Sequence, residues 1–367
     1  MTKQCSSMSD TTFYPGFSTE PMDTIFALPA RVGAMAAVEA AVATAQGAAG
    51  LIPADAADAI VAACAEPVRV EILAEGWQVG TPVLGLLDTL RSRLPEGATQ
   101  YLHHGLTTQD VVDTAAMMLA RQALDHLRDS TREATRSLRG IIDRSGDVAT
   151  QARSFLQPAD VTTVGFRTAR WLDQLDQVRR RIGSIRLPVQ LGGLIGDRMG
   201  ITTEVVNAVA ANLTLESRLP WHTDRSPVIR VVTYLTDIAR WAEKVGIDIA
   251  QLVQLGEVTT RAGGSSAAAG KRNPIDAMRA VAAAQACFGI ATVITHAKPH
   301  ELERGLGSWH AEWFALPLVF QTAAASLESI SAALASFEVE PSALVVADDR
   351  RASADAFVAE VLAHSPP

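Results

Sequence analysis

The longest uninterrupted helical pattern in the chain runs from Thr107 to Gly146, and it contains no proline and only one interior glycine. Its apolar residues recur at spacings of three and four, as in Val112, Ala116 and Leu119, which places them on one face of a helix. Thr107, or the threonine that follows it, can cap the first turn. A helix several times longer than the globular average of about 10–14 residues usually packs lengthwise against other long helices.

Further helical patterns cover most of the remaining chain. They occupy residues 33–48, 54–64, 160–183, 227–257, 275–297 and 310–336. Strand patterns are sparse, although residues 186–193 could form a short strand or an extended connector. The sequence therefore predicts an all-α protein with a long central helical bundle. We expect a small helical N-terminal domain at 1–95, the bundle at 96–336, and a short C-terminal tail at 337–367 with two short helices or a partly disordered end.

Composition excludes several classes of protein. With 48% hydrophobic and 20% charged residues among 367, the chain is an ordinary globular protein with a large core. A net charge of −8 disfavours nucleic acid and anionic membranes as partners. Cys5, Cys64 and Cys287 are too far apart to predict a metal site or a disulfide pattern. Because neither a signal peptide nor a charge-free apolar run of about 20 residues is evident, we expect a cytoplasmic protein.

Residues 262–274, AGGSSAAAGKRNP, combine small residues with a serine pair, a basic pair and a proline. A phosphate-binding P-loop is excluded, because five residues separate Gly264 from Gly270 and Arg272 stands where a hydroxyl is needed. A flexible linker explains the glycines but not the basic end that leads into a helix at Pro274. A loop that closes over a bound anion fits the pattern better.

Three segments resemble motifs of the fumarase/aspartase superfamily. GGSSAAAGKRNP resembles its signature loop, G-S-S-x-M-P-x-K-x-N-P, and HHGLTTQDVVDTA (103–115) resembles H-x-G-A-T-S-Q-D-x-x-D-T-A. ARSFLQPADVTTVGFRTARWL (152–172) resembles the R-T-x-x-Q-x-A segment that opens the second long helix. The resemblance extends over roughly residues 14–335 with the motifs in the same order, which is more specific than any one motif.

Two more segments resemble the bacterial 3-carboxy-cis,cis-muconate cycloisomerase branch, PWHTDR (220–225) and HELERGLGSWHAEWFALP (300–317). Phe155 stands where the amino-acid and nucleotide lyases have a catalytic histidine, and an apolar residue there is typical of this branch. The resemblance implies an all-α homotetramer with active sites shared between subunits, and a shortened third domain. It implies a cycloisomerase that converts 3-carboxy-cis,cis-muconate to 4-carboxymuconolactone in protocatechuate breakdown through the β-ketoadipate route.

The implied reaction adds one substrate carboxylate to a double bond and places a proton on the carbon next to another carboxylate. Stabilising the doubly charged aci-carboxylate intermediate is the largest catalytic task. Since the substrate supplies the nucleophile, the reaction requires no metal and no cofactor. The expected partners are a small tricarboxylate and further copies of the chain, with neither nucleic acid nor membrane.

In the signature loop, the resemblance implies that Ser265 transfers the proton and that Lys271 pairs with a substrate carboxylate. A serine hydroxyl is a poor acid or base near neutral pH, so backbone N–H groups and a nearby cation must tune it. Ser266 and Asn273 are the expected binding partners beside them. The alternatives are a turn-forming serine at 265 and a solvated surface charge at 271.

Thr107, Thr108 and Gln109 stand at the predicted start of the long helix, where free N–H groups and the helix dipole attract anions. We expect all three to bind a substrate carboxylate. His103 matches the histidine of the family motif and is a candidate catalytic residue, and His104 is an additional histidine beside it. Plain N-capping by Thr108 is the alternative, and it explains neither Gln109 nor the histidines.

Four more residues are expected to bind substrate, namely Gln157, His222, Arg225 and Arg304. Gln157 matches the amide of the second motif, while arginine suits bidentate binding of carboxylates. Each basic residue could equally form an ion pair between helices, for example Arg304 with Glu301.

The chain also departs from the family pattern. Ala268 and Ala269 replace the Met-Pro of the signature loop, so the open loop should be more flexible. Three hypotheses stay open, namely the cycloisomerase, another superfamily lyase that releases fumarate, and a non-catalytic helical scaffold. Phe155 and the tryptophan-rich segment argue against the second. The joint presence of the loop and helix-end residues argues against the third.

Overall fold

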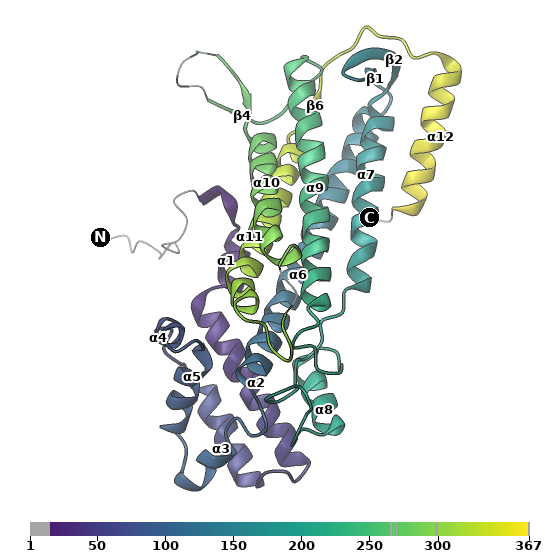
Figure 1. Cartoon of the computed structure of the whole chain (residues 1–367). Helices are drawn as coiled ribbons and strands as arrows, with labels where there is room; N and C mark the ends of the chain where they lie inside the picture. The colour runs from purple at the N-terminus through teal and green to yellow at the C-terminus, as the bar shows by residue number, and fades with distance from the viewer. Residues whose placement is uncertain (1–14, 265, 267, 269, 298–299, 366–367) are drawn as a thin grey trace.

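The computed structural model describes residues 15–264, 266, 268, 270–297 and 300–365. Long helices run along the length of the molecule (Figure 1): α6 (Thr108–Ser145), α7 (Val164–Arg181), α9 (Ser226–Gln254), α10 (Ile275–Thr295) and α11 (Ser308–Ala335). This arrangement confirms the predicted all-α class.

The helix α6 confirms the first prediction from the sequence. Thr107 is its N-cap, and the carboxylate of Asp110 in the first turn accepts a hydrogen bond from the Thr107 N–H (3.1 Å). The helix ends at Ser145, with Gly146 as its C-cap. At 1.5 Å per residue its 38 residues extend over about 57 Å. Features at its two ends are therefore far apart in one chain.

Several of the remaining helices gather at one end of the molecule (Figure 1), namely α2 (Leu28–Ala48), α3 (Ala54–Ala65), α4 (Ile72–Gln78), α5 (Pro82–Arg91) and α8 (Thr203–Leu213). The short helix α1 (Glu20–Ile25) precedes them, and 3-10 turns lie at Pro15–Phe17, Glu96–Tyr101 and Ile182–Ser184. The helix α2 packs against α3, α6 and α8, so it joins this end to the bundle. The domain boundaries stay a prediction.

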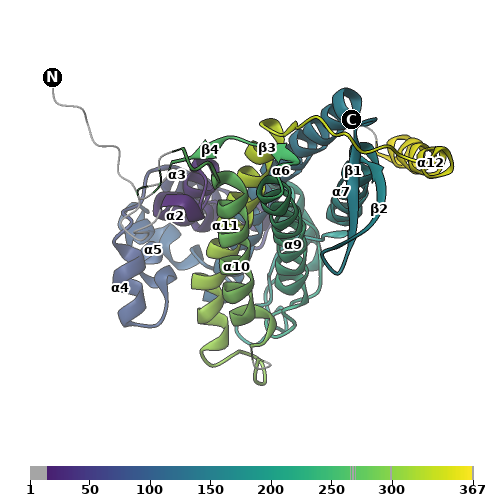
Figure 2. The same cartoon turned by 90° about the horizontal axis from the view of Figure 1, so that it is seen from above.

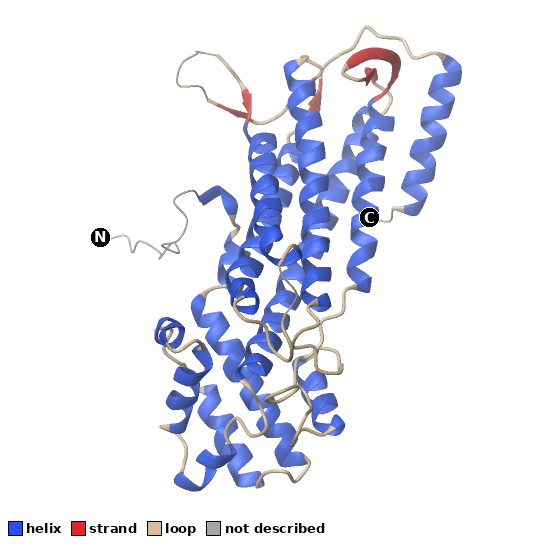
Figure 3. Cartoon of the chain, in the orientation of Figure 1, coloured by secondary structure: helices blue, strands red, loops and turns tan. Residues whose placement is uncertain are grey.

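Short antiparallel strand pairs lie at the other end of the bundle (Figure 3). They are β1 (Ala149–Ser154) with β2 (Gln157–Thr163), β3 (Val258–Thr259) with β6 (Glu338–Val339), and β4 (Ala262–Gly263) with β5 (Asn273–Pro274). The first pair is a hairpin whose two turn residues, Phe155 and Leu156, both have positive φ, as a type I′ turn requires.

Two expectations for the segments around the bundle need correction, and a third is resolved between its alternatives. The helix expected at 160–183 begins only at Val164, because the residues before it belong to β2. Residues 186–193 form the extended connector, one of the two alternatives, with an isolated bridge from Pro188 to Glu216. The C-terminal tail forms the two-residue strand β6 and one helix, α12 (Asp348–His364), instead of two helices. Seen from above, α12 lies on the outer side of α7 (Figure 2).

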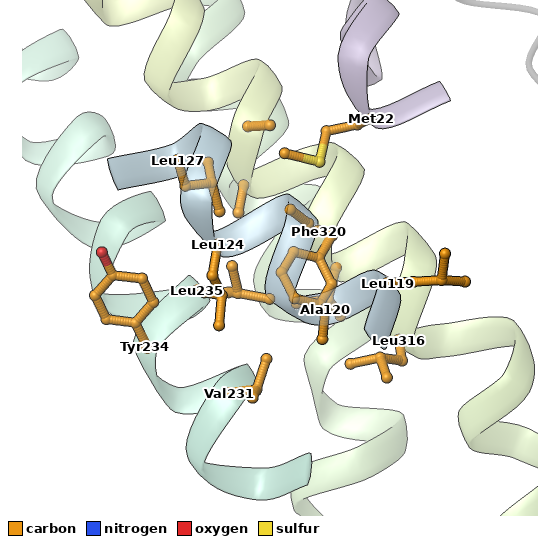
Figure 4. Close-up of a cluster of buried hydrophobic side chains, with 14 of the residues drawn as sticks. Met22, Leu119, Ala120, Leu124, Leu127, Val231, Tyr234, Leu235, Leu316 and Phe320 are labelled. Atoms are coloured by element: carbon orange, nitrogen blue, oxygen red, sulfur yellow. The ribbon is translucent and has the colours of Figure 1, made fainter. Parts of the chain in front are cut away.

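The core of the bundle forms where α6, α9 and α11 meet. Leu124 and Leu127 of α6 face Leu235 of α9 and Phe320 of α11 (Figure 4), and all four are buried. Burying one such side chain stabilises the fold by roughly 1.5–3 kcal/mol. The apolar face predicted from the spacing of residues in α6 is therefore the face that holds the bundle together.

By length and composition alone, α2, α10 and α11 are apolar enough to span a membrane, although each helix contains charged residues. In α2 and α11 more than half of the most apolar stretch is buried inside the chain, 56% and 61%. Packing against the other helices therefore explains most of their apolar character. For α10 the value is only 39%, and Met278 and Val293 are among its exposed apolar side chains. The helix α10 thus presents an apolar surface that the described residues leave largely uncovered.

Candidate active site

Arg304 lies against the N-terminal end of α6. Its Nη1 donates a hydrogen bond to Oγ1 of Thr107 and its Nη2 to the carbonyl oxygen of Leu194, both at 2.9 Å. Thr107 is the N-cap, so the guanidinium lies beside the free N–H groups of the helix end. Thr108 forms a 3.1 Å hydrogen bond with Thr81. A cation, the helix dipole and hydroxyl groups together suit a carboxylate.

His103 lies in the turn that leads into α6. Its Nδ1 is 2.6 Å from Oε1 of the buried Glu39 in α2, and Gln46 of α2 donates a 2.9 Å hydrogen bond to the carbonyl oxygen of His104. A carboxylate on one ring nitrogen sets the orientation of the imidazole. The helix α2 therefore holds the candidate catalytic histidine near the end of α6.

Gln109 and His222 are both buried and linked to each other. The Gln109 Nε2 donates to the carbonyl oxygen of His222 (2.9 Å) and to Asp113 (3.0 Å), and the His222 Nε2 is 3.1 Å from Oδ1 of Asp110. Gln109 Oε1 and His222 Nδ1 have no hydrogen-bond partner among the residues that the structure describes. Because buried polar atoms are nearly always paired, these two atoms are candidates for contact with a ligand.

Arg225 forms a buried ion cluster with two carboxylates. Its Nη1 is 2.6 Å from Oδ2 of Asp113 in α6, its Nη2 is 2.5 Å from Oε2 of Glu312 in α11, and the guanidinium lies over Trp221. Burial disfavours its charge, but the two carboxylates outweigh that effect and raise the Arg225 pKa above its ordinary value. Of the two interpretations open for this residue, the structure shows the ion pair between helices.

The signature loop is closed at its base by the pairing of β4 with β5. Asn273 Nδ2 donates a 3.0 Å hydrogen bond to the carbonyl oxygen of Gly264, which ties the two sides together. Ser266 and Lys271 are exposed on the loop, and Ser265 lies outside the described residues. The loop therefore presents an ammonium and a hydroxyl to the surroundings of the chain.

Gln157 lies on the β1–β2 hairpin and not on a helix, and its side chain is exposed. At the tip of the hairpin, Phe155 is 98% exposed and Leu156 is 68% exposed. Such exposure of two large apolar side chains in a tight turn is unusual for a surface that faces only water.

One chain does not bring the predicted site residues together. Thr107 and Arg304 lie at the start of α6, whereas the hairpin with Gln157 follows the end of that helix, about 57 Å away. The strand β4 at the base of the loop that carries Lys271 lies at the hairpin's end of the bundle (Figure 1), and the 21 residues of α10, about 31 Å long, separate this loop from the segment that carries Arg304. The predicted residues thus form three separate groups.

Sequence reasoning missed the acidic residues that organise the helix end. Asp110 follows the N-cap at the position of a capping-box acid, so the T-x-x-D pattern at 107–110 could have revealed it. Glu39 and Glu312 offer no comparable local pattern. Each comes from a helix distant in sequence from the group it orients.

A cavity of about 230 Å³ opens beside the ion cluster of Arg225, Asp113 and Glu312, between α2, α6 and α11. Its lining is mainly apolar, with Met35, Leu119 and Leu316 among its residues, and Arg225 is the only predicted site residue in it. Within the described part of the chain, no group of three or more His, Cys, Asp or Glu side chains could hold a metal ion.

Comparison with known proteins places this helical bundle in a class. A family model described as lyase matches residues 18–289, and the chain belongs to this family within the fumarase/aspartase superfamily. The match includes the motifs at 103–115 and 152–172 and the signature loop at 262–274.

Individual relatives narrow the comparison. The chain is 33% identical over 343 residues to 3-carboxy-cis,cis-muconate cycloisomerase of Pseudomonas aeruginosa, covering 88% of this chain and 74% of the relative. It is 31% identical over 319 residues to nitrosuccinate lyase of Streptomyces davaonensis, covering 80% and 67%. The crystal structure of 3-carboxy-cis,cis-muconate lactonizing enzyme from Pseudomonas putida aligns with a TM-score of 0.82 at 30% identity, covering 88% and 76%.

Proposed function

We propose that the protein is a cycloisomerase, an intramolecular lyase that closes 3-carboxy-cis,cis-muconate to 4-carboxymuconolactone in aromatic degradation. The observation that carries this proposal is the Arg304 guanidinium on the N-cap hydroxyl of Thr107. It offers a polyanion a positive helix end with several donors. Relatives named 3-carboxy-cis,cis-muconate cycloisomerase support the choice of substrate.

The proposed chemistry divides the work between the helix end and the loop. Thr107, Thr108 and Arg304 hold one carboxylate of the substrate. Meanwhile an oxygen of a second substrate carboxylate adds to one carbon of a double bond. The adjacent carbon then takes up one proton, for which we propose Ser265 as the donor and Lys271 as the cation that stabilises the intermediate. The serine regains its proton from water, so each turnover consumes one proton.

We further propose a homotetramer whose active sites combine groups from different subunits. In one chain the group at the start of α6 lies too far from the signature loop and from the hairpin for all of them to touch one small molecule, so they can act together only across subunits. The uncovered apolar face of α10 and the exposed tip at Phe155 supply surfaces that association would bury. We propose no nucleic-acid or membrane partner, and a cytoplasmic location stays a prediction.

The direct test is turnover of 3-carboxy-cis,cis-muconate by the purified protein. We expect the diene absorbance to disappear and the lactone to appear in the proton NMR spectrum. Release of fumarate from a succinyl-type substrate, without lactone formation, would favour the other lyase activity that the nitrosuccinate lyase relative represents. An assembled protein that turns over neither substrate would overturn the proposal and favour a scaffold.

A further inference from the structure

Five hydrogen-bond donors converge on the carboxylate of Asp110, a fully buried residue in the first turn of α6. Their distances from the two carboxylate oxygens lie between 2.8 and 3.1 Å. The donors are the backbone N–H groups of Thr107, Gly192 and Gly193, the side-chain amide of Gln190 and Nε2 of His222.

Four of these groups are donors whatever the tautomer of His222, two at each oxygen of Asp110, so both oxygens accept and the carboxylate is ionised. Asparagine has nearly the same shape, but its amide nitrogen would face either the Thr107 and Gly193 N–H groups or the other three donors. Donor facing donor in a buried site forfeits hydrogen bonds and leaves polar atoms unpaired. The position is therefore selective for the charge and not only for the size of Asp110.

The same carboxylate assigns the tautomer of His222. Since Asp110 accepts at Oδ1, the Nε2 of His222 carries the proton, and in the neutral ring Nδ1 carries the lone pair. Glycines cover this side of the ring. A Cβ on Gly192 would lie 2.8 Å from Cε1 of His222, and one on Gly196 would lie 3.3 Å from Nδ1. The buried Nδ1, which lacks a partner among the described residues, thus lies beneath a glycine-rich loop.

The loop that Asp110 holds also reaches Arg304. The carbonyl oxygen of Leu194, directly after the two anchored glycines, accepts from Arg304 Nη2, and Arg304 Nη1 donates to Thr107. Thr107 in turn donates its N–H to Asp110. A closed circuit of hydrogen bonds therefore runs from Asp110 through the loop and Arg304 back to the N-cap.

We propose that Asp110 is the positioning residue of the candidate active site, because it fixes the His222 tautomer and orients Arg304 over the end of α6. The proposal rests on the proposed function for its kinetic consequence, whereas the tautomer does not depend on any reaction. Groups that bind substrate must be held by packing and hydrogen bonds behind them, and Asp110 supplies that support from beneath the site.

The test compares Asp110→Asn with a matched control, Asp176→Asn. Asp176 is also buried, but it bonds to Arg179 and Ser365, away from the site. With 3-carboxy-cis,cis-muconate as substrate, we expect Asp110→Asn to raise KM about tenfold with a smaller change in kcat. Asp176→Asn should leave KM unchanged, because loss of folded protein alone lowers only the apparent kcat.

Nitrogen-15 NMR of histidine-labelled protein supplies a second reading that needs no turnover. We expect His222, assigned through His222→Gln, to carry its proton on Nε2 in the wild type and to lose that preference in Asp110→Ala, which removes both acceptor oxygens. A wild-type signal with the proton on Nδ1, or an unchanged tautomer in Asp110→Ala, would overturn the proposal. If the wild type has the expected tautomer but no turnover, the proposed function fails. The role of Asp110 in fixing the His222 tautomer then stands. If turnover is normal and KM is unchanged in Asp110→Asn, the positioning role fails.

Discussion

Arg225 forms ion pairs with the carboxylates of Asp113 and Glu312, and all three side chains are buried. Removing the arginine leaves two buried carboxylates without their guanidinium partner, which costs about 3–5 kcal/mol. We expect Arg225→Met to lower the free energy of unfolding by that amount in a urea titration. Arg132→Met, which breaks an exposed pair with Asp129, should cost about 1 kcal/mol or less. Unchanged stability with a raised KM would instead make Arg225 a substrate ligand.

Glu257 makes the stability of the fold depend on pH. Burial raises its pKa, but hydrogen bonds from Arg153 and Thr150 and the charge of Arg167 outweigh burial and lower the pKa below its ordinary value. Such a carboxylate stabilises the fold at neutral pH, and the contribution is lost as pH falls through the lowered pKa. We expect Glu257→Gln to be less stable than wild type at about pH 7 and the difference to shrink towards about pH 3. A difference independent of pH would contradict this account.

Side chains whose roles depend on neighbours in sequence could be predicted. Side chains whose partners lie far away in sequence could not. A cap at Thr107 or Thr108 was expected because capping involves only the next turn of the chain, and the structure shows it at Thr107. The partners of His103 and Arg225 are 64 and 112 residues away, and no local pattern indicates such pairs. The geometry at Ser265 stays a prediction, since this residue lies outside the described part of the chain.

Among the elements, long helices with a regular apolar spacing were predictable, as α6 and α9 show. The β1–β2 hairpin was not, because its turn is Phe155-Leu156 and not the Asn-Gly or Asp-Gly that marks such turns. The start of α7 was placed too early for the same reason, because the strand β2 that precedes it was not recognised.

Gly140 lies inside α6, where glycine costs about 1 kcal/mol relative to alanine. A Cβ at this position would approach only the flexible end of Arg144, at 3.3 Å from Nη1. We therefore expect Gly140→Ala to raise the free energy of unfolding by about 0.5–1 kcal/mol, measured by thermal or urea denaturation. Destabilisation would mean that the contact of Arg144 with the Phe337 carbonyl oxygen tolerates no displacement.

At the scale of the whole molecule, the bundle separates the groups that the proposed reaction needs. The sequence motifs indicate which residues act together, but they do not indicate that α6 and α10 hold them about 57 Å and 31 Å apart in one chain. That separation follows from helix length and becomes visible only in the fold (Figure 1). The account therefore depends on association of several chains.

The most direct test mixes two inactive variants. Arg304→Ala removes the cation at the helix end, and Lys271→Ala removes the cation on the loop. If each active site takes these groups from different subunits, random co-assembly of the variants gives about a quarter of the sites both intact groups. The control is co-assembly of Lys271→Ala with the variant that carries both Arg304→Ala and Lys271→Ala, because none of its sites contains Lys271. The account predicts recovery of about a quarter of wild-type lactone formation in the first mixture and none in the control; a first mixture as inactive as its separate components would contradict it.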